Sequence, residues 1–120
     1  STMFKKLSHP MMYVNDLERA VKFYCDKLNF KTRFYHQEAF ASLYNEDMNC
    51  RLDLHPTEAN SRDVGHGPII YFLTENLDRD LSLLISSGVK TGEPRTEGGS
   101  TRFVTFWDSE GNALGLEEAK

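Results

Sequence analysis

Three ionisable residues alternate in one short stretch of the sequence, at the spacing that places side chains on one face of a strand. They are Arg51, Asp53 and His55, and residues two apart in a β-strand point the same way. His9 begins another apolar stretch with the same alternation, and His66 lies in a Gly-His-Gly segment. Imidazole and carboxylate groups are the usual ligands of zinc and similar ions. His9, Asp53 and His55, joined by His66, could therefore hold a divalent metal.

The same residues also have plainer explanations. Arg51 could bind an anionic ligand with both arms of its guanidinium, or it could pair with Asp53 inside the protein. His55 precedes a proline and could end its strand at the surface, and His66 could be a solvated loop residue. A histidine on a half-buried strand, such as His9, is commonly a hydrogen-bonded core residue.

Aromatic and other large side chains are expected on the same face of the sheet as these ionisable groups. Aromatic rings could stack on a planar ligand, although on strands they more often pack against one another. The candidates with this parity are Met11, Tyr13, Tyr71, Phe103, Trp107 and Glu117. Residues 93–102, rich in Gly, Ser and Thr, could form a loop over them or a hairpin tip.

The elements that position these residues occur twice. Residues 9–24 align with residues 69–84 at a shift of sixty, and each stretch is an apolar strand followed by an amphipathic helix. We expect helices over residues 17–28 and 77–87, the first capped by Asn15 and the second ended by Gly88. Residues 43–55 align with residues 105–117 at a shift of sixty-two, each a strand, a polar turn and another strand.

The predicted fold is α+β, with two tandem β-α-β-β-β modules that form a cupped mixed sheet with helices on its outer face. Module one covers about residues 3–56, a polar linker about 57–67 and module two about 68–118, within a single domain of 120 residues. Residues 30–37 and 90–95 are expected as edge strands. Side chains alternate between the two faces of a strand, so the leucines at positions 52, 54, 114 and 116 are expected to pack under the helices. The residues between and beside them then point toward the opposite, concave face of the sheet, which we call the cup.

Composition excludes several classes of protein. The net charge of −4 and the scattered Lys and Arg residues argue against nucleic-acid binding. No apolar run approaches the roughly 20 residues that span a membrane. Cys25 and Cys50 form no CxxC pair, so we expect buried free thiols in a cytoplasmic protein. There is no G-x-S-x-G motif, no P-loop and no cysteine beside a plausible base, so any chemistry must come from the cup.

Two motifs give the chain a family resemblance. The paired modules, H-x-x-x-x-V-x-D-L-x-x-A-V-x-F-Y from His9 to Tyr24, and D-x-x-G-N-x-x-x-L from Asp108 to Leu116 resemble the vicinal oxygen chelate superfamily. That superfamily contains glyoxalase I, extradiol dioxygenases, fosfomycin-resistance enzymes and bleomycin-binding proteins. The resemblance covers nearly the whole chain and does not specify an activity.

The resemblance implies four metal-ligand positions, on the first and last strands of each module. They correspond here to His9, Ile69, Asp53 and Gly115. Isoleucine and glycine donate nothing to a metal. Glycine within a strand is also costly, because it brings no side chain to pack. Gly115 could leave space where a ligand side chain would stand, or it could make room for a neighbouring side chain.

The sequence therefore predicts a small-molecule-binding protein of the glyoxalase and bleomycin-resistance type that needs no cofactor. The resemblance implies a homodimer whose cup is completed near the subunit interface. The alternative is a glyoxalase-like lyase, or a related enzyme, that uses His9 and Asp53 to hold zinc, nickel or manganese. A third possibility is a dimer whose cup is filled by its own side chains. In each case the partners expected are a small molecule and a second copy of the chain, with neither nucleic acid nor membrane.

Overall fold

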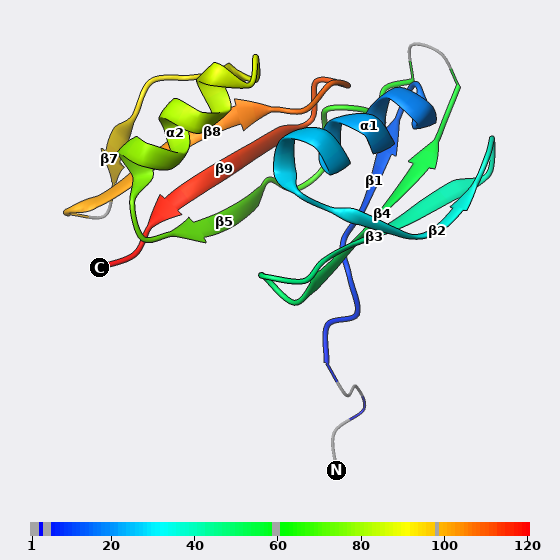
Figure 1. Ribbon diagram of the computed structural model, residues 1–120, viewed down its shortest axis with the longest axis horizontal. Coiled ribbons are helices and arrows are strands. Elements are labelled where there is room, and N and C mark those ends of the chain that lie inside the picture. The colour runs from blue at the N-terminus through cyan, green and yellow to red at the C-terminus, as the bar shows by residue number, and fades with distance from the viewer. Residues whose placement is uncertain (1–2, 4–5, 59–60, 98) are drawn as a thin grey trace.

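The computed structural model of the chain describes residue 3 and residues 6–58, 61–97 and 99–120. Within these residues eleven helices and strands follow one another and form two similar halves (Figure 1). The first half contains β1 (Met11–Val14), α1 (Leu17–Leu28), β2 (Lys31–His36), β3 (Phe40–Asn45) and β4 (Cys50–Pro56). The second contains β5 (Ile70–Thr74), α2 (Leu77–Ser86), β6 (Lys90–Thr91), β7 (Arg95–Glu97), β8 (Thr101–Trp107) and β9 (Ala113–Glu118).

Each half has its own mixed sheet. The strand order is β1-β4-β3-β2 in the first sheet and β5-β9-β8-β6 in the second, with β7 also paired to β8. β1 pairs with β4, and β5 with β9, in parallel, and the other pairs are antiparallel. The α+β fold of two β-α-β-β-β modules is thus confirmed. The edge strand expected over residues 90–95 consists of two short strands, β6 and β7.

Both helices lie where the apolar periodicity places them. α1 begins after Asp16, whose side chain accepts a hydrogen bond from the Arg19 amide at 3.0 Å. The expected cap, Asn15, is wrong by one residue, because Asp16 has the extended backbone that a cap requires. α2 begins after Asn76, and Gly88 follows its end with φ +83°, the left-handed conformation that glycine adopts readily.

Strand parity places the core and the cup on opposite faces of the sheets. Leu52, Leu54, Leu114 and Leu116 are buried, since α1 packs on β3 and β4 while α2 packs on β8 and β9. Cys25 and Cys50 are free thiols that are only partly buried at the margin of this core. Within the described residues no helix has the length and apolar character needed to cross a membrane.

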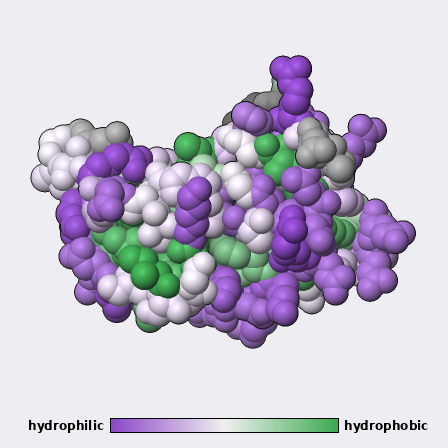
Figure 2. All heavy atoms as spheres, turned by 90° about the horizontal axis from the view of Figure 1, so that it is seen from above, coloured by the Kyte–Doolittle hydropathy of each residue, from purple (hydrophilic) through white to green (hydrophobic). Residues whose placement is uncertain are grey.

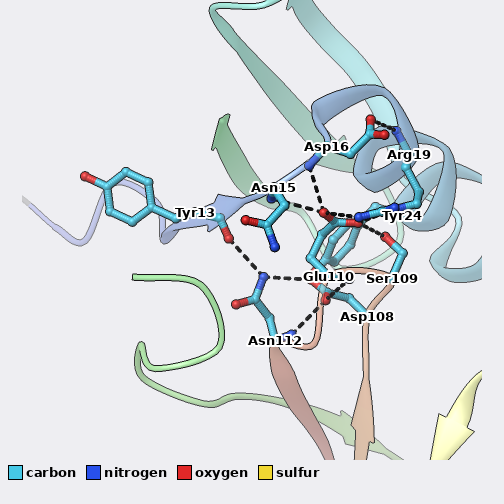
Figure 3. A network of polar contacts seen from close by, with 9 residues as sticks. All are labelled: Tyr13, Asn15, Asp16, Arg19, Tyr24, Asp108, Ser109, Glu110 and Asn112. Carbon is cyan, nitrogen blue, oxygen red and sulfur yellow. Dashed lines mark hydrogen bonds and ion pairs between the residues drawn. The ribbon is translucent and has the colours of Figure 1, made fainter. Parts of the chain in front are cut away.

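A polar turn of module two fastens onto module one (Figure 3). Asp108 is buried, and its carboxylate accepts hydrogen bonds from the Tyr24 hydroxyl at 2.7 Å and the Asn112 side-chain amide at 3.0 Å. It also accepts the backbone N–H groups of Glu110 and Asn112, both at 2.8 Å. The Asn112 amide donates in turn to the Tyr13 carbonyl at 3.1 Å. One buried carboxylate therefore satisfies four donors at the junction of the modules.

Glu110 binds the start of α1 from the same turn. Its carboxylate accepts the backbone N–H groups of Asn15 at 3.0 Å and Asp16 at 2.8 Å, and it pairs with the Arg19 side chain at 2.6 Å. These bonds satisfy N–H groups at the helix start, where the helix dipole favours a negative charge. The hydrogen bonds outweigh the desolvation that opposes them, so the pKa of Glu110 is lowered. We call residues 108–112 and their contacts on module one the clasp.

Candidate ligand-binding site

Asp53 is contacted by the side chains of Arg51 and His9 on the cup face of module one. Its carboxylate accepts two hydrogen bonds from Arg51, at 2.9 and 2.8 Å, and lies 3.2 Å from Nε2 of His9. The hydrogen bonds from Arg51, with further contributions from Ser42 and His9, lower the pKa of Asp53 to about 2 despite its burial. Of the two roles open to Arg51 from sequence, the structure shows the ion pair with Asp53.

The equivalent corner of module two contains an aromatic ring. Tyr71 lies opposite Gly115 in the register, as Met11 lies opposite Asp53 in module one. A Cβ atom on Gly115 would stand 2.4 Å from Cε1 of Tyr71, far inside van der Waals contact. The ring of Tyr71 therefore lies directly over the glycine. Of the two explanations for Gly115, the structure supports the second, in which glycine makes room for a neighbouring side chain. That side chain is Tyr71, and its ring occupies the space where the resemblance implies a metal ligand.

Contacts with two further residues hold the Tyr71 ring in place. Arg95 donates a hydrogen bond to the Tyr71 hydroxyl at 3.1 Å. Phe103 packs edge to face against the ring, with 5.6 Å between ring centres. Ile69 lies just before β5, two residues ahead of Tyr71; it is half exposed and brings no metal donor.

Most of the side chains that could bind a metal ion lie apart in the structure. Among the described residues no group of three or more His, Cys, Asp or Glu side chains is arranged to hold one. His55 stacks on Phe40, with 5.5 Å between ring centres, and His66 is exposed in the linker. Both carboxylate oxygens of Asp53 are already bonded to Arg51. A metal at His9 and Asp53 would have to displace that guanidinium.

A row of rings crosses the cup face of module one, and strand parity in the sequence identifies only part of it. His36 lies between Phe34 and Phe40, with ring centres 6.1 and 5.3 Å away. The Phe40 ring in turn stacks on the His55 ring, and Tyr13 on β1 lies opposite His55 in the register. Phe34 and His36 were missed because β2 contains an irregularity between Thr32 and Phe34, which breaks the simple alternation. Phe40 lies on β3 and shares the face of Ser42, so the alternation of β3 could have identified it.

The remaining candidates line module two. Lys90 stands over the Trp107 ring, 5.1 Å from its centre. Glu117 is half-buried on β9 and lies opposite Phe103 and Leu73 in the register. Over residues 93–102, β7 pairs with β8 as a hairpin, and the part of the expected loop at Gly98 lies outside the described residues.

Two cavities adjoin these residues between the modules. One, of about 430 Å³, is lined by Arg51 and Tyr71 together with apolar side chains such as Phe30 and Phe72. The other, of about 390 Å³, is lined by Met11, Tyr13 and linker residues that include Arg62 and His66. Small-molecule sites commonly enclose about 300 Å³ or more. The space beside the cup is therefore large enough for a small organic ligand and is not filled by the chain's own side chains.

The paired modules, their concave faces and the clasp define a protein of the paired β-α-β-β-β class. The sequence profile of the Glyoxalase/Bleomycin resistance protein/Dioxygenase superfamily matches residues 6–116, and the chain belongs to that superfamily. No curated protein matches the chain in sequence.

Solved structures share the fold over nearly their whole length. The fosfomycin resistance protein FosX from Listeria monocytogenes is 17% identical with a TM-score of 0.78, and the match covers 98% of this chain and 96% of that one. TnmS3, an antibiotic binding protein from Streptomyces sp. CB03234, is 20% identical with a TM-score of 0.80, over 99% of this chain and 100% of that one. A superfamily member from Sphaerobacter thermophilus DSM 20745 is 24% identical with a TM-score of 0.76, over 96% and 98%. At these identities the likeness establishes the fold.

Proposed function

We propose that the protein binds a small organic molecule in its cup without a metal ion. The observation that carries this proposal is the filling of two of the superfamily's metal-ligand positions. Arg51 saturates Asp53 in module one, and the Tyr71 ring covers Gly115 in module two. What remains on the cup faces is a set of aromatic rings with polar groups at fixed places, the usual composition of a binding pocket.

The superfamily neighbours support a ligand of this class. TnmS3 is an antibiotic binding protein, and FosX is a fosfomycin resistance protein. The alternative, a metal-dependent lyase that uses His9 and Asp53, requires Arg51 to leave a carboxylate that it contacts with two short hydrogen bonds. We therefore favour sequestration of a small molecule over catalysis.

Added metal is expected to leave the protein unchanged. Thermal melts of the tag-free protein with equimolar zinc, nickel or manganese should show the same midpoint as melts with a chelator, because an ion that does not bind the native state cannot stabilise it. Calorimetric titration should show no saturable heat. A raised midpoint together with one equivalent of bound metal, both lost in a His9→Ala variant, would instead establish the lyase-type site.

We further propose that two copies of the chain complete the cup. β1 and β5 are the outermost strands of their sheets, and their cup-side residues are exposed although apolar. These residues are Met11, Tyr13, Tyr71 and Leu73, with exposed fractions of 41%, 39%, 40% and 69%. Exposed apolar patches on edge strands are typical of surfaces that pair with another chain.

A single charge on this surface should separate the copies. Sedimentation should give the wild-type protein twice the mass of the chain, and Leu73→Glu should shift it toward the monomer, because burying a carboxylate in an apolar contact is unfavourable. Leu83→Glu is the matched control, since Leu83 is 59% exposed on the outer helix α2. Figure 2 shows that apolar side chains are exposed on the module-two side of the molecule. A monomeric wild type, or equal dissociation by both substitutions, would contradict the proposed interface.

A further inference from the structure

One cationic side chain lines the larger of the two cavities. Among the described residues around this space of about 430 Å³, Arg51 on β4 is the one that carries a charge. Most of the others are apolar, such as Phe30, Leu52 and Phe72. Burial raises the pKa of the Cys50 thiol, which also lines the cavity and stays uncharged. The cavity is thus an apolar space with one ionised group at its wall.

One end of the Arg51 guanidinium is free to meet a molecule in this cavity. Nε and Nη2 donate to the two carboxylate oxygens of Asp53, at 2.9 and 2.8 Å. A guanidinium carries five N–H donors in a planar fork, so the two N–H groups of Nη1 lie outside this pair. Within the part of the chain that the structure describes, Nη1 has no hydrogen-bond partner. The side chain is 32% exposed, so a ligand can reach these donors.

The charge of Arg51 is already compensated. The pKa of Asp53 is about 2, lowered mainly by the hydrogen bonds from Arg51, so the carboxylate is ionised at neutral pH. The two side chains together are neutral. A carboxylate brought into the cavity would lose its hydration without meeting an uncompensated positive charge, which makes an anionic ligand unfavourable there.

A ligand without any polar atom is unfavourable for another reason. It would displace water from the Nη1 donors and leave them without an acceptor, and an unsatisfied donor costs free energy. A neutral oxygen, such as that of a carbonyl group, satisfies these N–H groups and brings no charge. The surrounding rings and aliphatic side chains then contact the apolar body of the ligand.

Resting on the proposed function, we infer that the ligand is an uncharged, largely apolar molecule with a carbonyl-type oxygen, and that Nη1 of Arg51 donates to that oxygen. Asp53 acts as a positioning residue, because it fixes the plane of the guanidinium and cancels its charge. Tyr71 and Leu73 belong both to this cavity and to the surface proposed to pair with a second copy. The ligand therefore lies beside that proposed interface.

Three naphthalenes that differ only in one substituent test this assignment. They are 2-acetylnaphthalene, 2-isopropylnaphthalene and 2-naphthoate, whose substituents each have three non-hydrogen atoms. Affinities are measured by displacement of the fluorescent dye phenylnaphthylamine. We expect the ketone to bind at least as tightly as the hydrocarbon, although water solvates the ketone better, because Arg51 donates to its oxygen. The carboxylate should bind about tenfold more weakly than the ketone or worse.

Removal of the whole ion pair shows whether Arg51 causes this preference. Arg51→Met combined with Asp53→Leu replaces the pair by apolar side chains and leaves no unpaired charge. The affinity of the ketone relative to that of the hydrocarbon should fall by about tenfold, which corresponds to the loss of one hydrogen bond from a charged donor. Arg102→Met combined with Asp78→Leu is the matched control, since this pair joins β8 to α2 through two hydrogen bonds at 3.1 and 2.9 Å. The control should leave the relative affinities within about twofold of wild type.

A single substitution tests the compensation of charge. Asp53→Asn keeps an oxygen that accepts from Arg51 but removes the negative charge. The affinity for 2-naphthoate should rise by about tenfold, because the guanidinium is then uncompensated, and that for 2-acetylnaphthalene should stay within about threefold of wild type. This variant also tests the inference if the double variant does not fold.

Three results would overturn the inference. The first is binding of 2-naphthoate by the wild type as tightly as 2-acetylnaphthalene. The second is an unchanged ratio of ketone to hydrocarbon affinity in a folded Arg51→Met, Asp53→Leu variant, or an equal change of that ratio in the control. The third is an unchanged affinity for 2-naphthoate in Asp53→Asn. Failure of the wild type to bind phenylnaphthylamine or any of the three naphthalenes would refute the proposed function itself, and that outcome is distinct from the other three.

Discussion

Replacing Asp108 by alanine is expected to lower the free energy of unfolding by about 4 kcal/mol, since four hydrogen bonds to a buried carboxylate are lost at roughly 1 kcal/mol each. The donors are the Tyr24 hydroxyl, the Asn112 amide and two backbone N–H groups. Burial, and then the charge of Asp108, raise the pKa of Tyr24 well above its ordinary value. The Tyr24 hydroxyl therefore holds its proton more firmly than that of an exposed tyrosine and remains a donor.

Urea denaturation of a small set of variants checks this prediction. Tyr24→Phe removes one donor and should lower the free energy of unfolding by about 1 kcal/mol. Asp26→Ala is the matched control, an exposed aspartate on α1 whose replacement should stay within about 0.5 kcal/mol of wild type. If Asp108→Ala lowers the free energy of unfolding by no more than Asp26→Ala does, the clasp does not hold the modules together.

Replacing Gly115 by alanine is expected to destabilise the protein by about 1 to 3 kcal/mol, because the new methyl group and the Tyr71 ring cannot occupy the same space. Alanine is otherwise the more favourable residue within a strand, since glycine loses more conformational freedom on folding. The direction of the effect therefore depends on Tyr71 alone.

A double-mutant cycle isolates that dependence. In a Tyr71→Ala background, Gly115→Ala should be neutral or slightly stabilising, and the coupling between the two positions should reach about 1 kcal/mol or more. The free energies come from denaturation of the wild type, both single variants and the double variant. The same destabilisation in both backgrounds would mean that the ring does not require the glycine.

The repeats and the strand parity could be predicted because they depend on local spacing. The shift of sixty between residues 9–24 and 69–84 reappears in the register, where Met11 faces Asp53 and Tyr71 faces Gly115. α1 covers Leu17–Leu28, as its apolar stripe indicates. The superfamily assignment from two short motifs is confirmed by the sequence profile.

The contacts between distant segments could not be predicted in this way. Tyr24 belongs to the apolar stripe of α1, and nothing in its neighbourhood reveals that its hydroxyl bonds to Asp108, 84 residues later. Glu110 accepts hydrogen bonds from the backbone N–H groups of Asn15 and Asp16, and no pattern of side chains in the sequence indicates these contacts. Phe34 and His36 were missed because the irregularity in β2 interrupts the alternation of side chains along the strand.

The most direct test of a metal-independent cup is a fluorescence titration with phenylnaphthylamine, performed on protein dialysed against a chelator and repeated after zinc is added. Phenylnaphthylamine is a neutral aromatic dye, so its binding reports the aromatic and apolar surface of the cup. We predict one saturable site for each cup, with the same dissociation constant in the presence of the chelator and of the metal. Binding that disappears with the chelator, and returns when zinc, nickel or manganese is supplied in stoichiometric amount, would contradict a metal-independent cup.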